Sequence, residues 1–163
     1  MRQNFDDNIT YLVGGQKIVR KFRDIPARMP FDETILDFLN DVSRKLMTDR
    51  RVREYSDVAT FAFWIRRASV LKLKERFCGE DGNIHMGRGT VFHIAPSNVP
   101  VNYAYSLAAG LITGNANLVR VPSKDFPQTE IINSAINVVL EEYPQLKPYI
   151  CLVRYGRSKE IND

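Results

Sequence analysis

Two short polar segments of the sequence combine residue types that could bind a ligand, and each follows a predicted β-strand. The first reads Ala95-Pro96-Ser97-Asn98-Val99-Pro100, and the second reads Arg120-Val121-Pro122-Ser123-Lys124-Asp125. One offers a carboxamide between two prolines, and the other offers a guanidinium, a hydroxyl and an ammonium group. Because ligands of parallel α/β sheets bind beyond the carboxyl ends of the strands, both segments are candidate binding loops.

Asn98 and Arg120 also have purely structural interpretations. Asparagine is a favoured cap for a helix that follows, and a cap contributes about 1 kcal/mol of stability. Pro96 and Pro100 fix the backbone of the turn, so that Asn98 points at one spot. Arg120 could be an ordinary surface arginine at a strand end, because basic residues are mostly exposed. Residue type alone favours the capping role for Asn98.

The first segment lacks the glycine pattern of an ordinary dinucleotide-binding turn. No glycine occurs between Gly89 and Gly110, so no GxGxxG sequence follows the first strand of this region. A pyrophosphate cannot approach such a turn in the usual way. The sequence therefore disfavours a plain Rossmann dehydrogenase.

The periodicity of apolar residues predicts the elements that position the two loops. Strand, helix, strand, helix and strand are predicted in that order, over residues 90–94, 100–113, 117–121, 127–143 and 149–153. Short links between alternating strands and helices predict a parallel sheet with right-handed crossovers. The predicted fold class is therefore α/β, with one mononucleotide-binding βαβαβ half of a doubly wound fold.

A hairpin and two helices are predicted before this unit. Gly14-Gly15 separates two β-prone runs, residues 9–13 and 16–22, and two glycines suit a two-residue hairpin turn. One helix is predicted to begin after Asp32 and another at Ser56. They are expected to end near Met47 and at Phe77, respectively. This divides the chain into an N-terminal lead-in, residues 1–86, and a partial nucleotide-binding domain, residues 87–163.

Composition limits the class of protein. Hydrophobic residues make up 44% and charged residues 26% of the 163 residues, which excludes a disordered chain. No apolar run reaches membrane-spanning length and the first residues lack a secretory pattern, so we expect a cytoplasmic protein. Cys78 and Cys151 lie far apart and the chain has two histidines, so neither a disulfide framework nor a metal site is predicted.

The net charge of +4 has its densest basic region in residues 50–76. Acidic residues are interleaved with the basic ones there, which is typical of a solvated helix face. The alternatives are a nucleic-acid site and a surface for the phosphate-rich face of an acyl carrier. No helix-turn-helix or aromatic-basic strand motif accompanies the charge, so a nucleic-acid-binding module is the least favoured function.

The ordered features of residues 87–132 resemble the aldehyde dehydrogenase superfamily. They are the turn His93-Ile94-Ala95-Pro96-Ser97-Asn98-Val99-Pro100, the helix sequence Leu107-Ala108-Ala109-Gly110, and Gly114-Asn115-Ala116-Asn117-Leu118-Val119-Arg120. The Pro-Ser-Asn-Val-Pro turn and the arginine at the strand end are most similar to LuxC-type acyl-CoA reductases. That group includes the fatty-acid reductase of bacterial bioluminescence.

The resemblance implies roles for both loops. In the superfamily, the asparagine at the position of Asn98 donates its side-chain amide to the oxygen of the thioester, so Asn98 is expected to be catalytic. The residue at Arg120 contacts the ribose of the cofactor, and Ser123, Lys124, Ala95 and Pro96 are expected to join it. Donors and cations at these positions favour a 2′-phosphate, which implies NADPH in preference to NADH.

The resemblance also implies the reaction. An acyl-CoA reductase converts an acyl thioester and NADPH to an aldehyde, a free thiol and oxidised cofactor through an acyl-cysteine intermediate. Neither Cys78 nor Cys151 matches the position of the superfamily's nucleophile, so the chain by itself is expected to be inactive. The implied partners are acyl-CoA or an acyl carrier, acyl-transferring proteins, and further copies of the chain.

Two other functions remain open. One is aldehyde oxidation within the same superfamily, although the oxidising enzymes usually keep tryptophan where Ser97 stands. The other is a non-catalytic binding or assembly module that uses its helices as an interface. The sequence that follows residue 163 would discriminate between an enzyme and such a module, because only the enzyme needs a cysteine-bearing domain there.

Overall fold

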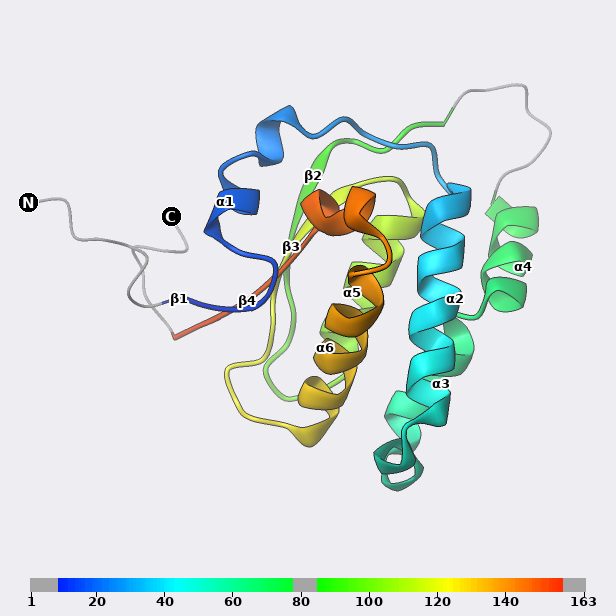
Figure 1. Ribbon diagram of the computed structural model, residues 1–163, viewed down its shortest axis with the longest axis vertical. Coiled ribbons are helices and arrows are strands. Elements are labelled where there is room, and N and C mark those ends of the chain that lie inside the picture. The colour runs from blue at the N-terminus through cyan, green and yellow to red at the C-terminus, as the bar shows by residue number, and fades with distance from the viewer. Residues whose placement is uncertain (1–8, 78–84, 157–163) are drawn as a thin grey trace, which may run out of the picture.

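A four-stranded sheet with the strand order β1-β4-β3-β2 forms the centre of the structure. The computed structural model describes residues 9–77 and 85–156 (Figure 1). Strands β2 (Thr90–Ile94), β3 (Ala116–Arg120) and β4 (Ile150–Tyr155) are parallel, whereas β1 (Ile9–Val13) pairs antiparallel with β4. The predicted parallel unit of three strands is therefore confirmed, with strand bounds within a few residues of those expected.

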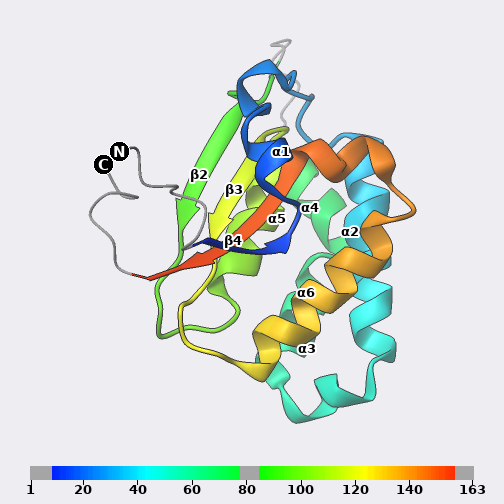
Figure 2. The same ribbon diagram turned by 60° about the vertical axis from the view of Figure 1, so that its left-hand side comes forward.

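Helices connect the parallel strands and cover one face of the sheet (Figures 1 and 2). Helix α5 (Asn102–Ile112) joins β2 to β3, and α6 (Pro127–Leu140) joins β3 to β4. Helix α2 (Glu33–Thr48) packs against both, and α3 (Ser56–Trp64) and α4 (Arg67–Phe77) lie beyond it. This arrangement confirms the α/β fold class.

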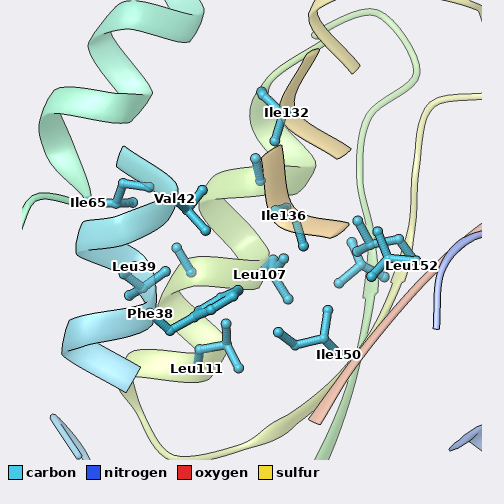
Figure 3. Close-up of a cluster of buried hydrophobic side chains, with 14 of the residues drawn as sticks. Phe38, Leu39, Val42, Ile65, Leu107, Leu111, Ile132, Ile136, Ile150 and Leu152 are labelled. Atoms are coloured by element: carbon cyan, nitrogen blue, oxygen red, sulfur yellow. The ribbon is translucent and has the colours of Figure 1, made fainter. Parts of the chain in front are cut away.

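The hydrophobic core lies between the sheet and α2, and Figure 3 shows part of it. Phe38 and Val42 of α2 are buried together with Leu107 of α5, Ile136 of α6 and Leu152 of β4. Burying an aliphatic or aromatic side chain of this size contributes ~1.5–3 kcal/mol. The core therefore holds the N-terminal helices and the parallel sheet together.

The start of α2 agrees with its prediction. The Asp32 carboxylate accepts hydrogen bonds from the backbone N–H groups of Thr34 and Ile35, at 3.0 and 3.4 Å. These are two of the N–H groups that a helix leaves without an intrahelical partner, so Asp32 is a true N-cap. Arg28 also contacts the same carboxylate at 3.1 Å, which fixes its position.

The predicted N-terminal hairpin is wrong. β1 forms as expected, but the second run folds into the short helix α1 (Gln16–Val19) and a 3₁₀ turn, η2 (Phe22–Asp24), instead of a strand. Gly14 adopts a positive φ of 77° and lies close to β4, where an added Cβ would be 2.8 Å from the carbonyl oxygen of Ile150. The glycine therefore turns the chain out of the sheet, because β4 already supplies the pairing partner of β1.

The predicted single helix from Ser56 to Phe77 is also wrong, because two helices, α3 and α4, occupy these residues. The break falls at the buried Ile65, whose ψ of 1° ends α3. The backbone N–H of Arg67 then donates to the side-chain oxygen of Asn40 in α2, at 3.2 Å. A side chain of α2 thus accepts a hydrogen bond from a backbone N–H that the first turn of α4 leaves without an intrahelical partner. This tertiary contact outweighs the local sequence pattern, which favours one continuous helix.

Backbone hydrogen bonds also tie the lead-in to the sheet. Arg28 donates its N–H to the carbonyl of Gly114 (2.9 Å), and the Arg28 carbonyl accepts from Gly87 (3.0 Å). The Arg28 guanidinium lies 4.9 Å above the ring of Tyr149. Residues on both sides of the predicted boundary at 86 and 87 thus share one set of contacts, and the division into two domains stays a prediction.

Candidate functional site

The two candidate loops leave the sheet side by side. In the parallel register of β2 and β3, Ile94 pairs with Arg120, and these are the last residues of their strands. Residues 95–100 and 121–126 therefore begin at neighbouring positions on the carboxyl edge of the sheet, as Figure 2 shows at the arrowheads. The fold therefore brings together two segments that begin 26 residues apart in the sequence, at Ala95 and at Val121.

Asn98 lies exposed in a turn between β2 and α5. The N-cap residue of α5 is Val101, and no side chain caps that helix, so the predicted capping role is wrong. Within the described residues, the Asn98 side chain makes no hydrogen bond. Pro96 is also exposed, whereas Ala95 is half-buried at the base of the turn. The carboxamide is thus accessible to a ligand, and it neither caps α5 nor bonds to another described residue.

Arg120 is half-buried and has defined partners. Its Nη2 donates to the carbonyl oxygen of Tyr155 at 3.3 Å, and its guanidinium carbon lies 4.6 Å from the centre of the Tyr155 ring. Its Nε is buried without a hydrogen-bond partner. The plain surface interpretation of Arg120 is therefore wrong, because the end of β4 orients its head group. Sequence reasoning missed Tyr155, which no motif singled out.

Ser123 and Lys124 are both exposed in the loop after β3. The Lys124 ammonium lies 5.2 Å from the centre of the Phe126 ring. The neighbouring acidic residue, Asp125, forms an ion pair with Arg154 of β4. Because that ion pair engages the Asp125 carboxylate, the hydroxyl of Ser123 and the ammonium of Lys124 remain available for an anionic group.

A cavity of about 740 Å³ borders the Asp125–Arg154 pair on the helix side of the sheet. Its walls come from α6, from Leu12 of β1 and from Arg154. Polar side chains of α6, among them Asn133 and Asn137, line it together with Phe126 and Val138. Asp125 and Phe126 of the loop after β3 also line this cavity, whereas none of its lining residues belongs to the turn that holds Asn98.

A buried polar contact supports the strands beneath the two loops. Asn117 of β3 is fully buried, and its Nδ2 donates to the carbonyl of Asn115 at 2.7 Å. Its Oδ1 lies 3.0 Å from Nε2 of His93 in β2, so the imidazole donates this hydrogen bond. An added Cβ on Gly110 of α5 would lie 1.8 Å from Oδ1. The sequence analysis did not identify this contact. The signals that could have indicated it are a glycine inside a predicted helix, Gly110, and an asparagine inside a predicted strand, Asn117.

The Gly114–Asn115 step ends α5 as predicted. Gly114 has a positive φ of 82°. The Asn115 side chain accepts from the backbone N–H of Arg88 at 2.7 Å and donates to the Thr113 hydroxyl at 2.8 Å. These bonds fix the approach to β2 and the start of β3 relative to each other. The motif that the sequence singled out thus has a structural role.

Cys151 lies in the middle of β4 and is fully buried. Burial raises the pKa of its thiol to about 11, so the thiol is protonated at neutral pH. The thiolate is the reactive form of cysteine. The Cys151 side chain is therefore unreactive in the folded protein, because it is protonated and buried. The predicted structural role of Cys151 is confirmed. The same prediction for Cys78 falls outside the described residues.

We expect Cys151 to resist thiol reagents in the folded protein. In a Cys78→Ser variant, Cys151 is the sole thiol, and its reaction with Ellman's reagent should be at least ~100-fold slower than in guanidinium chloride, because labelling requires opening of the sheet. The release of the coloured thiolate measures both rates. Equal rates in the native and unfolded protein would contradict the buried position of this thiol.

Two further observations concern metals and membranes. Across residues 9–77 and 85–156, no three His, Cys, Asp or Glu residues come together as ligands for a metal ion. The helices in these ranges are all too short or too polar to cross a bilayer.

The parallel βαβαβ unit, with two polar loops at its carboxyl edge, defines an α/β protein of the nucleotide-binding-like class. The family model for acyl-CoA reductase (LuxC) matches residues 19–162, which is most of the chain. The chain therefore belongs to the LuxC acyl-CoA reductase family. A comparison with curated proteins gives no match. The predicted resemblance is thus confirmed, and with it an acyl-CoA reductase function in general terms.

Proposed function

We propose that this protein contributes the carboxamide and cofactor loops of an NADPH-dependent acyl-CoA reductase, which converts an acyl thioester to an aldehyde through an acyl-cysteine intermediate. The overall reaction consumes one hydride and one proton and releases the free thiol and oxidised cofactor. The observation that carries the proposal is the pairing of Ile94 with Arg120, which starts both polar loops at one edge of the sheet. Membership of the LuxC family supports it.

Asn98 supplies the hydrogen-bond donor for the reaction. Its side-chain amide is exposed and uncommitted within the described residues. Negative charge develops on the acyl oxygen when a thiolate attacks the thioester, and a positioned amide N–H stabilises that charge. Pro96 and Pro100 limit the backbone freedom of the turn, so the donor is positioned before the substrate arrives.

The residues at the end of β3 fit a phosphate-bearing cofactor. Ser123 offers a hydroxyl and Lys124 an ammonium group, and both are exposed. Asp125, which would repel a phosphate, is neutralised by Arg154. Arg120 is held at the base of this loop by Tyr155, and Ala95 and Pro96 complete the site from the neighbouring loop. When bound, NADPH supplies the hydride.

The nucleophile of the proposed reaction is a thiol other than Cys151. The side chain of Cys151 is fully buried in β4, and its raised pKa keeps it protonated. An acyl group could not reach it without opening the sheet. A separate cysteine therefore accepts the acyl group, and the loops described here bind and orient the other reactants. By itself, the chain is expected to bind cofactor without turnover.

We expect a Lys124→Ala variant to bind NADPH about tenfold more weakly, because a charge-assisted contact to a phosphate contributes ~1.5 kcal/mol. Its affinity for NADH should change less than twofold, since NADH lacks the 2′-phosphate. Arg120→Ala should weaken the binding of both cofactors. Titration of the intrinsic cofactor fluorescence with the protein measures each dissociation constant.

The matched control for this experiment is Lys74→Ala. Lys74 is an exposed lysine of α4, away from both loops, so its removal changes the net charge equally. If Lys74→Ala weakens NADPH binding as much as Lys124→Ala does, the effect is one of overall charge and the cofactor assignment fails. NADPH affinities that are the same in the wild-type, Lys124→Ala and Arg120→Ala proteins would also overturn it.

A further inference from the structure

A groove of about 390 Å³ lies at the opposite end of the sheet from the two loops. It runs between α1 and the 3₁₀ turn η4 (Pro144–Tyr149), which precedes β4. Figures 1 and 2 both show α1 beside this turn. Ile18, Pro144 and Pro148 supply its apolar surface. We call it the Ile18 groove.

Cationic side chains surround the Ile18 groove. Lys17, Arg20, Lys21 and Lys147 line it, and none of its lining residues is acidic. Lys147 forms an ion pair with Glu141 at 2.6 Å, but Lys17 and Lys21 are exposed and make no ion pair with any described residue. The groove therefore combines an apolar floor with an excess of positive charge at its rim.

We propose that the Ile18 groove docks an acidic segment of a partner protein, which inserts one apolar side chain between Ile18 and the two prolines. Charge complementarity selects an acidic partner, and burial of an apolar side chain supplies affinity. The prolines lack free N–H groups and have a fixed φ, so the floor presents no unpaired donor and is ordered before binding.

The shape of the groove favours a protein partner over a membrane surface. A bilayer is approached best by protruding apolar side chains, whereas here the apolar side chains line a hollow. The groove also lies at the amino ends of the parallel strands, away from Asn98. A partner bound there would leave the carboxyl edge open, so docking and the proposed reaction could proceed together.

The test uses the whole chain and a fluorescein-labelled peptide, Asp-Glu-Leu-Phe-Asp-Glu, with binding followed by fluorescence anisotropy. We expect saturable binding that the double variant Lys17→Glu/Lys21→Glu weakens by at least about tenfold, since two attractive contacts become repulsive. The control, Lys72→Glu/Lys74→Glu, makes the same charge change on exposed lysines of α4 and should alter binding less than twofold.

A second peptide with serines in place of Leu-Phe tests the apolar part of the site, and its binding should be lost. Equal binding of the two peptides, equal loss in both double variants, or no saturable binding would overturn the proposal. Binding to phosphatidylglycerol vesicles without binding to the peptide would assign the groove to a lipid surface and would also overturn it. Circular dichroism of each variant shows whether the fold is retained.

Discussion

Replacing Asn98 with alanine is expected to lower the kcat of acyl-CoA reduction about 100-fold and to leave thermal stability unchanged. A donor positioned at a developing oxyanion contributes ~3 kcal/mol to transition-state stabilisation. Stability should not change, because the side chain is exposed and caps no helix. The assay follows NADPH oxidation by a polypeptide that contains both this turn and the nucleophilic cysteine, and calorimetry gives the Tm.

Ser97→Ala is the matched control for Asn98→Ala. Ser97 is the exposed neighbour of Asn98 in the same turn, so its truncation tests the turn without removing the carboxamide. We expect its kcat to stay within about twofold of the wild type, because surface substitutions away from special features have small effects. Full activity in Asn98→Ala would refute the proposed donor. Equal losses in the two variants would show that the turn matters and that the amide does not.

Gly110→Ala is expected to destabilise the protein by about 3 kcal/mol, although alanine is the better helix former. The propensity gain in a helix is ~1 kcal/mol. It is outweighed because the new Cβ would lie 1.8 Å from Oδ1 of Asn117, which must move away. Its hydrogen bonds to His93 and Asn115 are then lost, and each unsatisfied buried polar group costs ~1–3 kcal/mol. Urea denaturation measures the change in the free energy of unfolding.

The control for Gly110→Ala is Ala109→Ser, because Ala109 precedes it in α5 and is exposed. That substitution adds an atom to the same helix at an exposed position. It should lower the free energy of unfolding by no more than ~0.5 kcal/mol, the difference in helix propensity between alanine and serine. If Gly110→Ala is as stable as the wild type, the strand can move to accept the methyl group. The close approach of α5 to β3 would then not be a constraint on the sequence.

The sequence predicted the parallel unit because its elements are locally consistent. Thr90–Ile94 is β-branched and aromatic, and Pro127 stands at the first position of the amphipathic helix α6. Each of these local preferences agrees with the final fold. The predictions that failed concern segments whose structure depends on a residue or strand far away in the sequence. Gly14 has a positive φ, which suits a turn, but the strand that pairs with β1 is β4, which begins at Ile150, 137 residues after Val13.

The break between α3 and α4 could not be predicted for a similar reason. The apolar residues continue through Ile65 without a proline or glycine, so the local pattern favours one helix. The hydrogen bond from Arg67 to Asn40 comes from α2 and leaves no local signal. At the candidate site, the sequence identified both loops, but it did not reveal that Tyr155 orients Arg120 or that Arg154 pairs with Asp125.

The shared core has a thermodynamic consequence for the helices of the lead-in. Phe38 and Val42 of α2 are packed against α5 and α6, and Arg28 bonds to Gly114 at the end of α5. A molecule that binds the loops after β2 and β3 in the native state alone raises the free energy of unfolding of every element that unfolds cooperatively with those loops. Amide exchange in α2 should therefore report occupancy of a site that α2 never touches.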